Sequence, residues 1–242
     1  MAVDSSRLLS LLSNIRETGE FSDIEVKCGS SSFHLHCCVI CPQSGFFSGV
    51  MKHDFQETRS RIVTISDDPF IASKMFDYLY RADYDDHPEI PNDLPDKDEN
   101  KDEESPEVSV EHQDTSLDTL PSHWRYARIN VQVYVIADKY MIDALKGVSR
   151  KKLQSNMENE WNEIGFINVV QDVYGPEFPP GSEICNLLAR FALQHVSTLK
   201  DSQNFQQIRK KYPQFGYDFS TLLMERVIEL EGSAGDEEAV PW

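Results

Sequence analysis

The sequence has little positive charge. Its 242 residues include 23 Lys and Arg against 41 Asp and Glu, which gives a formal net charge of −18. A protein that binds nucleic acid through the phosphates needs a basic surface, because Lys and Arg must displace counterions. The basic runs at residues 150–152 and 209–211 are short and stand near predicted helix ends, where they suit the helix dipole. We therefore expect no nucleic acid among the partners.

Long apolar runs are also missing. No stretch approaches the roughly 20 apolar residues of a membrane helix. The N-terminal segment lacks the basic region and the apolar core of a signal peptide. The five cysteines are an odd number, which without a signal peptide is typical of reduced thiols. These features predict an intracellular protein, in the nucleus or the cytoplasm, with no membrane partner.

The motifs of common catalytic sites are absent. The sequence has no H-E-x-x-H, no G-x-S-x-G and no glycine-rich phosphate loop. A Cys–His hydrolase needs a thiol and an imidazole that meet. Cys185 and His195 stand ten residues apart in one predicted helix, which separates them by about 15 Å along its axis. We expect neither an enzyme nor a cofactor.

One cluster of cysteines and histidines could in principle hold a metal ion. It consists of His34, His36, Cys37, Cys38 and Cys41. Structural zinc sites draw four ligands, usually from two separated pairs, and no second pair follows at a suitable distance. A thioredoxin-like redox pair would precede a long helix in a βαβ setting. We therefore interpret these cysteines as small buried hydrophobic residues and expect no metal.

Negative charge is concentrated in one segment. Residues 83–118 hold 15 Asp or Glu and two Lys, a net charge of −13, so the rest of the chain carries about −5. Several prolines and no periodic apolar face accompany this charge. Such a composition cannot offset the entropy of ordering. We predict an acidic disordered insertion at about 85–120, because helical patterning resumes after it.

The residues before the insertion predict a mixed α/β unit. A first helix over residues 5–19 has an apolar face formed by Leu8, Leu11, Leu12 and Ile15. That face packs either on its own domain or across a subunit interface. Strands are predicted at 21–29, 32–38 and 61–67, and short helices near 39–41 and 44–52. Asp68 and Pro69 then predict the start of a helix that continues to about residue 84.

The residues after the insertion have a helical pattern throughout. Helices are predicted over residues 122–154, 153–174, 182–199, 202–211 and 218–231. A proline- and glycine-rich break separates the second from the third. The sequence therefore predicts an α+β fold followed by an all-helical extension.

An ordered set of motifs resembles a BTB/POZ domain of the fungal type. The set consists of Phe21-Ser22-Asp23-Ile24, His36, Val39-Ile40, Ser44-Gly45-Phe46-Phe47, Phe55-Gln56-Glu57 and Tyr78-Leu79-Tyr80. The resemblance implies a small mixed sheet flanked by helices over residues 5–147, with the acidic insertion inside. A helical extension at 148–231 and a flexible tail at 232–242 would follow. The residues that mark the fold are Asp23, His36, Ser44 and Phe47.

The resemblance implies a protein–protein interaction module. Many such domains homodimerise through the first helix, which assigns Leu8, Leu11, Leu12 and Ile15 to a dimer interface. Many also act as substrate adaptors for cullin-type ubiquitin ligases. Those adaptors carry a hydrophobic–x–acidic signature, which Phe55, Gln56 and Glu57 match here. Phe55 would fill a pocket of the cullin and Glu57 would bind a donor; alternatively, Phe55 closes the core and Glu57 is solvated.

Two functions therefore stay open. The first is a cullin adaptor whose target protein the sequence does not identify. The second is a regulatory scaffold without a ligase role, which uses homotypic contacts and the acidic insertion. In some transcriptional relatives a basic residue follows the position of His36 and forms a charged pocket with Asp23. Here Cys37 takes that place, which argues against such a pocket.

Overall fold

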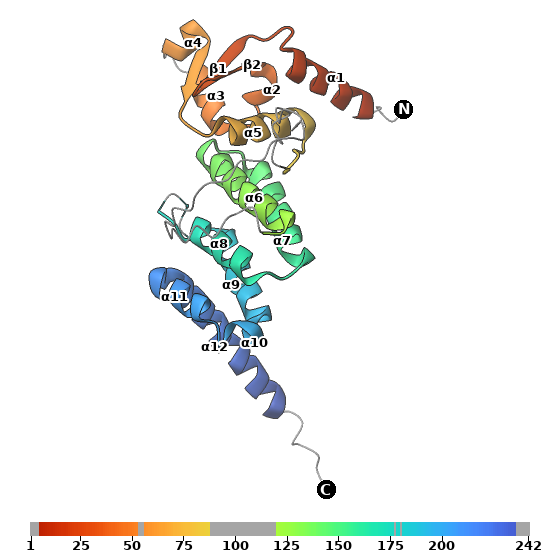
Figure 1. The fold of residues 1–242 in the computed structure, drawn as a ribbon. Helices are drawn as coiled ribbons and strands as arrows, with labels where there is room; N and C mark the ends of the chain where they lie inside the picture. The colour runs from red at the N-terminus through yellow and green to blue at the C-terminus, as the bar shows by residue number, and fades with distance from the viewer. Residues whose placement is uncertain (1–4, 53–55, 88–119, 177, 180, 236–242) are drawn as a thin grey trace, which may run out of the picture.

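The computed structural model shows an elongated molecule with a small sheet at one end and helices along the rest of its length (Figure 1). It describes residues 5–52, 56–87, 120–176, 178–179 and 181–235. The elements before residue 88 are α1 (Ser5–Thr18), β1 (Ile24–Cys28), β2 (Ser31–Leu35), α2 (Cys37–Ile40), α3 (Gly45–Lys52), α4 (Gln56–Ser60), β3 (Ile62–Ile65) and α5 (Pro69–Arg81). Those after residue 119 are α6 (Ser122–Lys139), α7 (Asp143–Asn159), α8 (Glu163–Val173), α9 (Glu183–Gln194), α10 (Val196–Leu199), α11 (Gln203–Lys211) and α12 (Pro213–Gly235). Among the described residues, no helix has both the length and the apolar character that crossing a bilayer requires.

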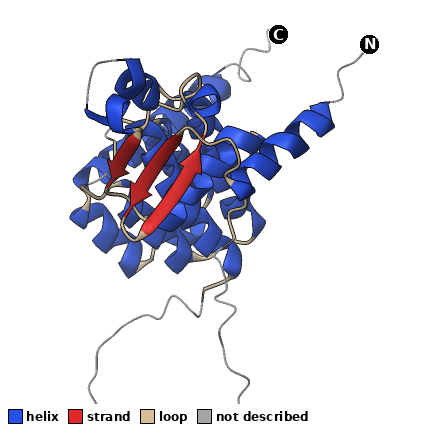
Figure 2. Ribbon diagram, turned by 90° about the horizontal axis from the view of Figure 1, so that it is seen from above, coloured by secondary structure: helices blue, strands red, loops and turns tan. Residues whose placement is uncertain are grey.

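The three strands form one mixed sheet in the order β2-β1-β3. β1 pairs antiparallel with β2, which places Ile24 opposite Leu35, and parallel with β3, which places Val26 opposite Val63. The alternate residues Ile24, Val26 and Cys28 of β1 are buried, as alternation predicts for a strand with one covered face. Figure 2 shows the strands side by side in front of the helices. The predicted α+β fold class is confirmed.

The start of α5 follows the prediction from its capping residues. The Asp68 carboxylate accepts hydrogen bonds from the N–H groups of Phe70 and Ile71, and Pro69 occupies the first turn. The helix ends at Arg81, three residues earlier than predicted, because Ala82 adopts a left-handed conformation with φ 58°.

No sequence pattern predicts α4. Its five residues are polar and have no apolar periodicity. The helix is held on α3 instead, because the hydroxyl of Thr58 donates to the backbone oxygen of Val50 at 2.7 Å. A tertiary contact of this kind leaves no local signal in the sequence.

The prediction of one helix over residues 122–154 is wrong. The chain breaks between α6 and α7 at Met141, which has a φ of 54°. The break turns Ile142, 1% exposed, into the core beneath the sheet. Neither Gly nor Pro stands at the break, so packing rather than local propensity ends α6.

The predicted helix over residues 153–174 is also divided. Asn162 begins α8 as its N-cap, and its side chain accepts a hydrogen bond from the N–H of Gly165 at 2.8 Å. Gly165 lets α8 approach α6 closely, since a Cβ at this position would lie 2.4 Å from the ring of Trp124.

Three further helix boundaries differ from the predictions. The predicted helix over residues 182–199 is divided at His195 into α9 and α10. α12 begins at Pro213, five residues before its predicted start. It also runs to Gly235, so the first four residues of the segment 232–242 are helical rather than part of a flexible tail.

Two hydrophobic cores follow one another along the molecule. The first lies beneath the sheet, and the second lies among the helices that follow the sheet-bearing unit. α6 serves both cores, because Val133 and Ala137 belong to the first and Trp124 and Tyr134 to the second. The expected domain boundary at residue 147 falls inside α7. The helical extension is therefore continuous with the sheet-bearing unit through α6 and α7, which contribute side chains to both cores.

Candidate functional site

α1 divides its apolar face between the molecule's own core and the surface. Leu12 and Ile15 are half-buried and pack against the first core. Leu8 and Leu11 are 54% and 57% exposed, and Leu9 beside them is 42% exposed. The helical spacing places the four predicted residues on one face, but only the structure separates the anchoring pair from the exposed pair.

Arg16 fixes α1 on α5. Its guanidinium lies 3.2 Å from a carboxylate oxygen of Asp77 and also stands over the rings of Phe33 and Phe76. Burial lowers the pKa of Arg16, and the charge of Asp77 opposes that shift. The helix is therefore held in one direction, and its N-terminal half projects from the molecule (Figure 1).

Asp23 closes the N-terminus of α2. One oxygen of its carboxylate accepts a hydrogen bond from the N–H of Cys37 at 2.7 Å. The residue at the N-cap position, His36, makes no capping bond with its own side chain. A carboxylate at a helix N-terminus is favourable because the first N–H groups are unpaired and the helix dipole is positive there. Asp23, directly before β1, thus caps α2 in place of the side chain at the N-cap position.

His36 joins three segments of the chain. Its Nε2 lies 2.7 Å from the backbone oxygen of Glu20, which can only accept, so Nε2 carries the proton. Nδ1 lies 2.7 Å from the hydroxyl oxygen of Tyr80, and the same oxygen accepts from the backbone N–H of His36 at 2.9 Å. Burial raises the pKa of Tyr80 to about 12, which keeps this hydroxyl protonated. The buried imidazole therefore ties the end of β2 to the α1–β1 loop and to α5.

Ser44 and Phe47 fasten α3 to the turn between α6 and α7. The buried hydroxyl of Ser44 donates to the backbone oxygen of Tyr140 at 2.7 Å and accepts from the N–H of Phe47 at 3.2 Å. The N–H of Gly45 donates to the backbone oxygen of Met141 at 3.2 Å. Phe47 is fully buried and stacks on the ring of Tyr140, with 5.6 Å between centroids. The four marker residues therefore all lie at junctions between elements.

The hydrophobic–x–acidic signature lies at the start of α4. Phe55 is outside the described residues. Gln56 is exposed and Glu57 is half-buried in the first turn of the helix. α4 and the projecting part of α1 lie at the same end of the molecule, on opposite sides of the sheet (Figure 1).

The sheet-bearing end of the molecule matches a known family. Residues 12–96 match the model of the BTB/POZ domain. The chain contains a BTB/POZ domain. A search of the curated proteins finds no match. Since domains of this family are protein–protein interaction modules, the exposed faces of α1 and α4 are the surfaces of interest.

A basic residue that sequence reasoning missed lies beside Cys37 in the BTB/POZ domain. The guanidinium of Arg61, a residue with a left-handed backbone before β3, lies 3.6 Å from Sγ of Cys37. Burial, and next the charge of Asp23, raise the pKa of Cys37 to about 12, so the thiol stays protonated and is a poor nucleophile. Arg61 is 24 residues from Cys37 in sequence, so no local motif could have indicated this neighbour.

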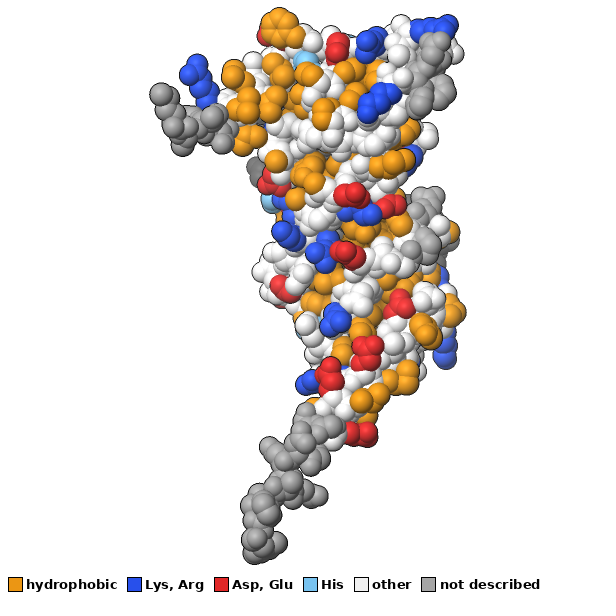
Figure 3. Space-filling view, turned by 180° about the vertical axis from the view of Figure 1, so that it is seen from behind, with side chains coloured by type: hydrophobic (Ala, Val, Ile, Leu, Met, Phe, Trp, Pro, Cys, Tyr) orange, Lys and Arg blue, Asp and Glu red, His pale blue; other side chains and the backbone are white. Residues whose placement is uncertain are grey.

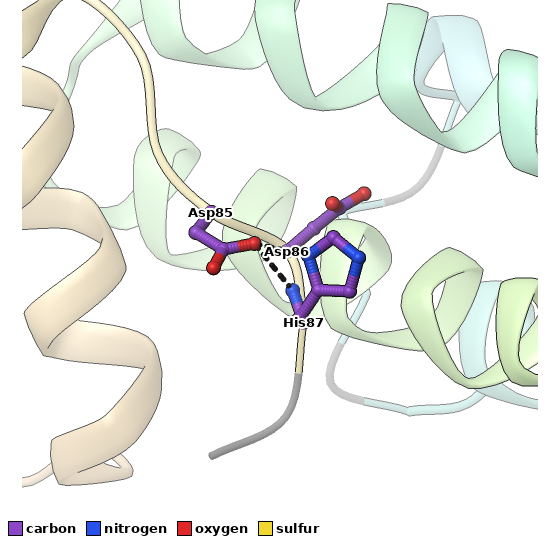
Figure 4. Close-up of side chains that lie close together, drawn as sticks. All are labelled: Asp85, Asp86 and His87. Carbon is purple, nitrogen blue, oxygen red and sulfur yellow. Dashed lines mark hydrogen bonds and ion pairs between the residues drawn. The ribbon is translucent and has the colours of Figure 1, made fainter.

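One group of potential metal ligands occurs among the described residues, and it contains no cysteine. It consists of Asp85, Asp86 and His87, shown in Figure 4. One oxygen of Asp86 accepts hydrogen bonds from the side-chain amides of Asn130 and Asn156, at 2.8 and 2.9 Å. One oxygen of Asp85 accepts from the backbone N–H of His87 and pairs with its ring. These groups thus hold the segment after α5 on α6 and α7.

Cys185 and His195 stand at opposite ends of α9. Cys185 is buried, and its Sγ lies 3.6 Å from the hydroxyl of Ser182. The ring of His195 stacks on Trp161, with 4.0 Å between centroids, and burial lowers its pKa. Each residue is therefore engaged with a different neighbour.

Proposed function

We propose that this chain is a protein–protein interaction module that forms homodimers through α1. The observation that carries the proposal is the exposed part of the helix, where Leu8 and Leu11 present apolar surface while Leu12 and Ile15 anchor the helix on its own core. A patch of large apolar side chains on a rigidly held helix is typical of an interface. Two copies that pack these patches together would bury the leucines on both sides of a twofold axis.

Light scattering coupled to size-exclusion chromatography tests the homodimer. The double variant Leu8→Glu, Leu11→Glu should have half the molar mass of the parent, because a dimer would have to bury two charges from each copy in the interface. Its circular dichroism should stay unchanged, since both side chains are exposed. Ile164→Glu is the matched control, because it places a charge at a similarly exposed apolar position on α8. This variant should have the same molar mass as the parent.

Within this role we propose cullin-adaptor activity as the finer function. The support is the placement of Gln56, which is exposed, and Glu57, which is half-buried, in the first turn of α4 directly after Phe55. Titration calorimetry with a cullin N-terminal domain tests it. Glu57→Lys should weaken binding about tenfold or more, which corresponds to about 1.4 kcal/mol, and Glu158→Lys on α7 should not. No binding by the parent at tens of micromolar would remove the adaptor role and leave the interaction module.

The second function is a regulatory scaffold that works without a ligase. Its support is the charge of −13 in residues 83–118, which favours basic partners. Replacing each Asp of residues 88–118 by Asn and each Glu by Gln tests this role. The range begins after Asp86, so the contacts of that residue are kept. The scaffold role predicts that the variant keeps its thermal transition. Its binding to poly-lysine should be weaker than that of the parent by more than the weakening that a fivefold rise in salt concentration causes in the parent. Equal binding by both proteins would count against it.

A further inference from the structure

The C-terminal half of α12 carries an apolar face that the described part of the chain leaves uncovered. The first half of the helix buries Phe215, Phe219 and Leu222 in or near the second core. Every side chain from residue 223 to residue 231 is exposed. The large apolar ones among them are Leu223, Met224, Val227, Ile228 and Leu230. In Figure 1 this half of α12 extends beyond the other helices, at the end of the molecule opposite the sheet.

The exposed apolar residues share one side of the helix. At 100° per residue, all five fall within an arc of about 160°. This arc is rotated away from the buried stripe of the first half. Where that stripe would continue, the helix has Arg226 and Glu229, whose side chains pair at 3.0 Å. The exposed face is therefore a separate apolar surface of the helix and not a continuation of the stripe that packs on the core.

The charges around this face are not balanced. Arg226 is engaged by Glu229. Within the described residues, the carboxylates of Glu225 and Glu231 have no hydrogen-bond or ion-pair partner. In the space-filling view of Figure 3, acidic and apolar side chains alternate at this end of the molecule. A second copy packed on the face would bring like charges together, whereas a basic partner would complement them.

We propose that this half of α12 docks an amphipathic helix of a partner protein whose apolar side is flanked by Lys or Arg. Leu223, Val227 and their neighbours pack against the apolar side of that helix. Glu225, which borders the arc, pairs with a basic residue on the flank of that helix, and Glu231, at the C-terminal end of the apolar face, pairs with a basic residue at the end of its apolar side. This is the helix-against-helix form of peptide recognition, in which residues three and four positions apart anchor the contact. The site lies far from α1 and α4 (Figure 1), so it does not depend on homodimers or on cullin binding.

Fluorescence anisotropy of the full chain tests the proposal. The probe is a synthetic helix of leucines and lysines with leucine at every third and fourth position, at physiological ionic strength. The double variant Val227→Gln, Ile228→Gln should bind it at least about tenfold more weakly. Glutamine is a good helix former and both positions are exposed, so the fold should persist. The variant Glu225→Gln, Glu231→Gln should bind a few-fold more weakly, with a smaller dependence on salt.

Two controls separate docking from general attraction to an acidic protein. A peptide of the same composition, scrambled to remove its apolar side, should bind at least about tenfold more weakly than the probe. Ile164→Gln removes a similarly exposed apolar side chain from α8 and should leave probe binding unchanged. Equal binding of both peptides, or full binding by the α12 variant, would overturn the proposal. The proposal would also be overturned if sedimentation showed that the parent is a dimer and that Val227→Gln, Ile228→Gln is a monomer, since the occupant would then be a second copy.

Discussion

Ser44→Ala tests how strongly the BTB/POZ domain is joined to the helices that follow it. The hydroxyl of Ser44 is buried and makes two hydrogen bonds, one to the backbone oxygen of Tyr140 and one from the N–H of Phe47. Alanine removes both without opening a large cavity. The substitution therefore leaves a buried acceptor in the α6–α7 turn and an uncapped donor in the first turn of α3.

The expected loss of stability follows from these two groups. Removing a Ser N-cap costs about 1 kcal/mol. Leaving a buried backbone acceptor unpaired costs about 1–3 kcal/mol. Because one side chain serves both groups, the costs overlap, and we expect a total of about 2–3 kcal/mol.

Urea unfolding followed by circular dichroism measures this loss. The midpoint should fall with an unchanged slope, because the amount of surface exposed on unfolding stays the same. Ser48→Ala is the matched control: it lies one turn further along α3, its hydroxyl makes no hydrogen bond within the described residues, and its effect should stay within about 0.5 kcal/mol. A loss below about 1 kcal/mol for Ser44→Ala would refute the reasoning.

Three further predictions concern the helical extension. Gly165→Ala should destabilise the chain by about 1–3 kcal/mol in the same assay, because its Cβ would lie 2.4 Å from Trp124; no change would mean that α8 shifts freely. Asp172→Asn should cost about 1 kcal/mol, and less in high salt, since it breaks a two-bond ion pair with Arg128 at 2.6 and 3.0 Å; a cost independent of salt would contradict this. Burial lowers the pKa of His195, so its contribution to stability is present above about pH 6.5 and is lost as the pH falls through the lowered pKa. His195→Phe should therefore reduce the fall in melting temperature between about pH 7 and pH 5, and an unchanged profile would contradict the assignment.

The sheet-bearing unit could be predicted well because its signals are local. Alternation marks β1, and the Asp68-Pro69 pair marks the start of α5. The order of the marker residues was specific enough to identify the BTB/POZ domain, which the family match confirms. In these segments propensity, pattern and packing all favour the same structure.

The missed features depend on contacts between distant residues. α4 rests on a hydrogen bond from Thr58 to α3, and the chain breaks between α6 and α7 at Met141 because the next residue enters the core. Arg61 reaches Cys37 from another loop. Helical spacing could group the apolar residues of α1, but it could not show that Leu8 and Leu11 stay exposed. Burial of this kind is set by tertiary packing, which a single sequence does not encode locally.

Hydrogen–deuterium exchange at several protein concentrations tests the central claim most directly, because it shows which helix forms the interface. If α1 is the homodimer interface, the amides of residues 8–15 should exchange faster when the parent is diluted through its dimer–monomer range. The same amides in Leu8→Glu, Leu11→Glu should exchange fast at every concentration. Exchange in α1 that is independent of concentration and equal in both proteins would contradict the account.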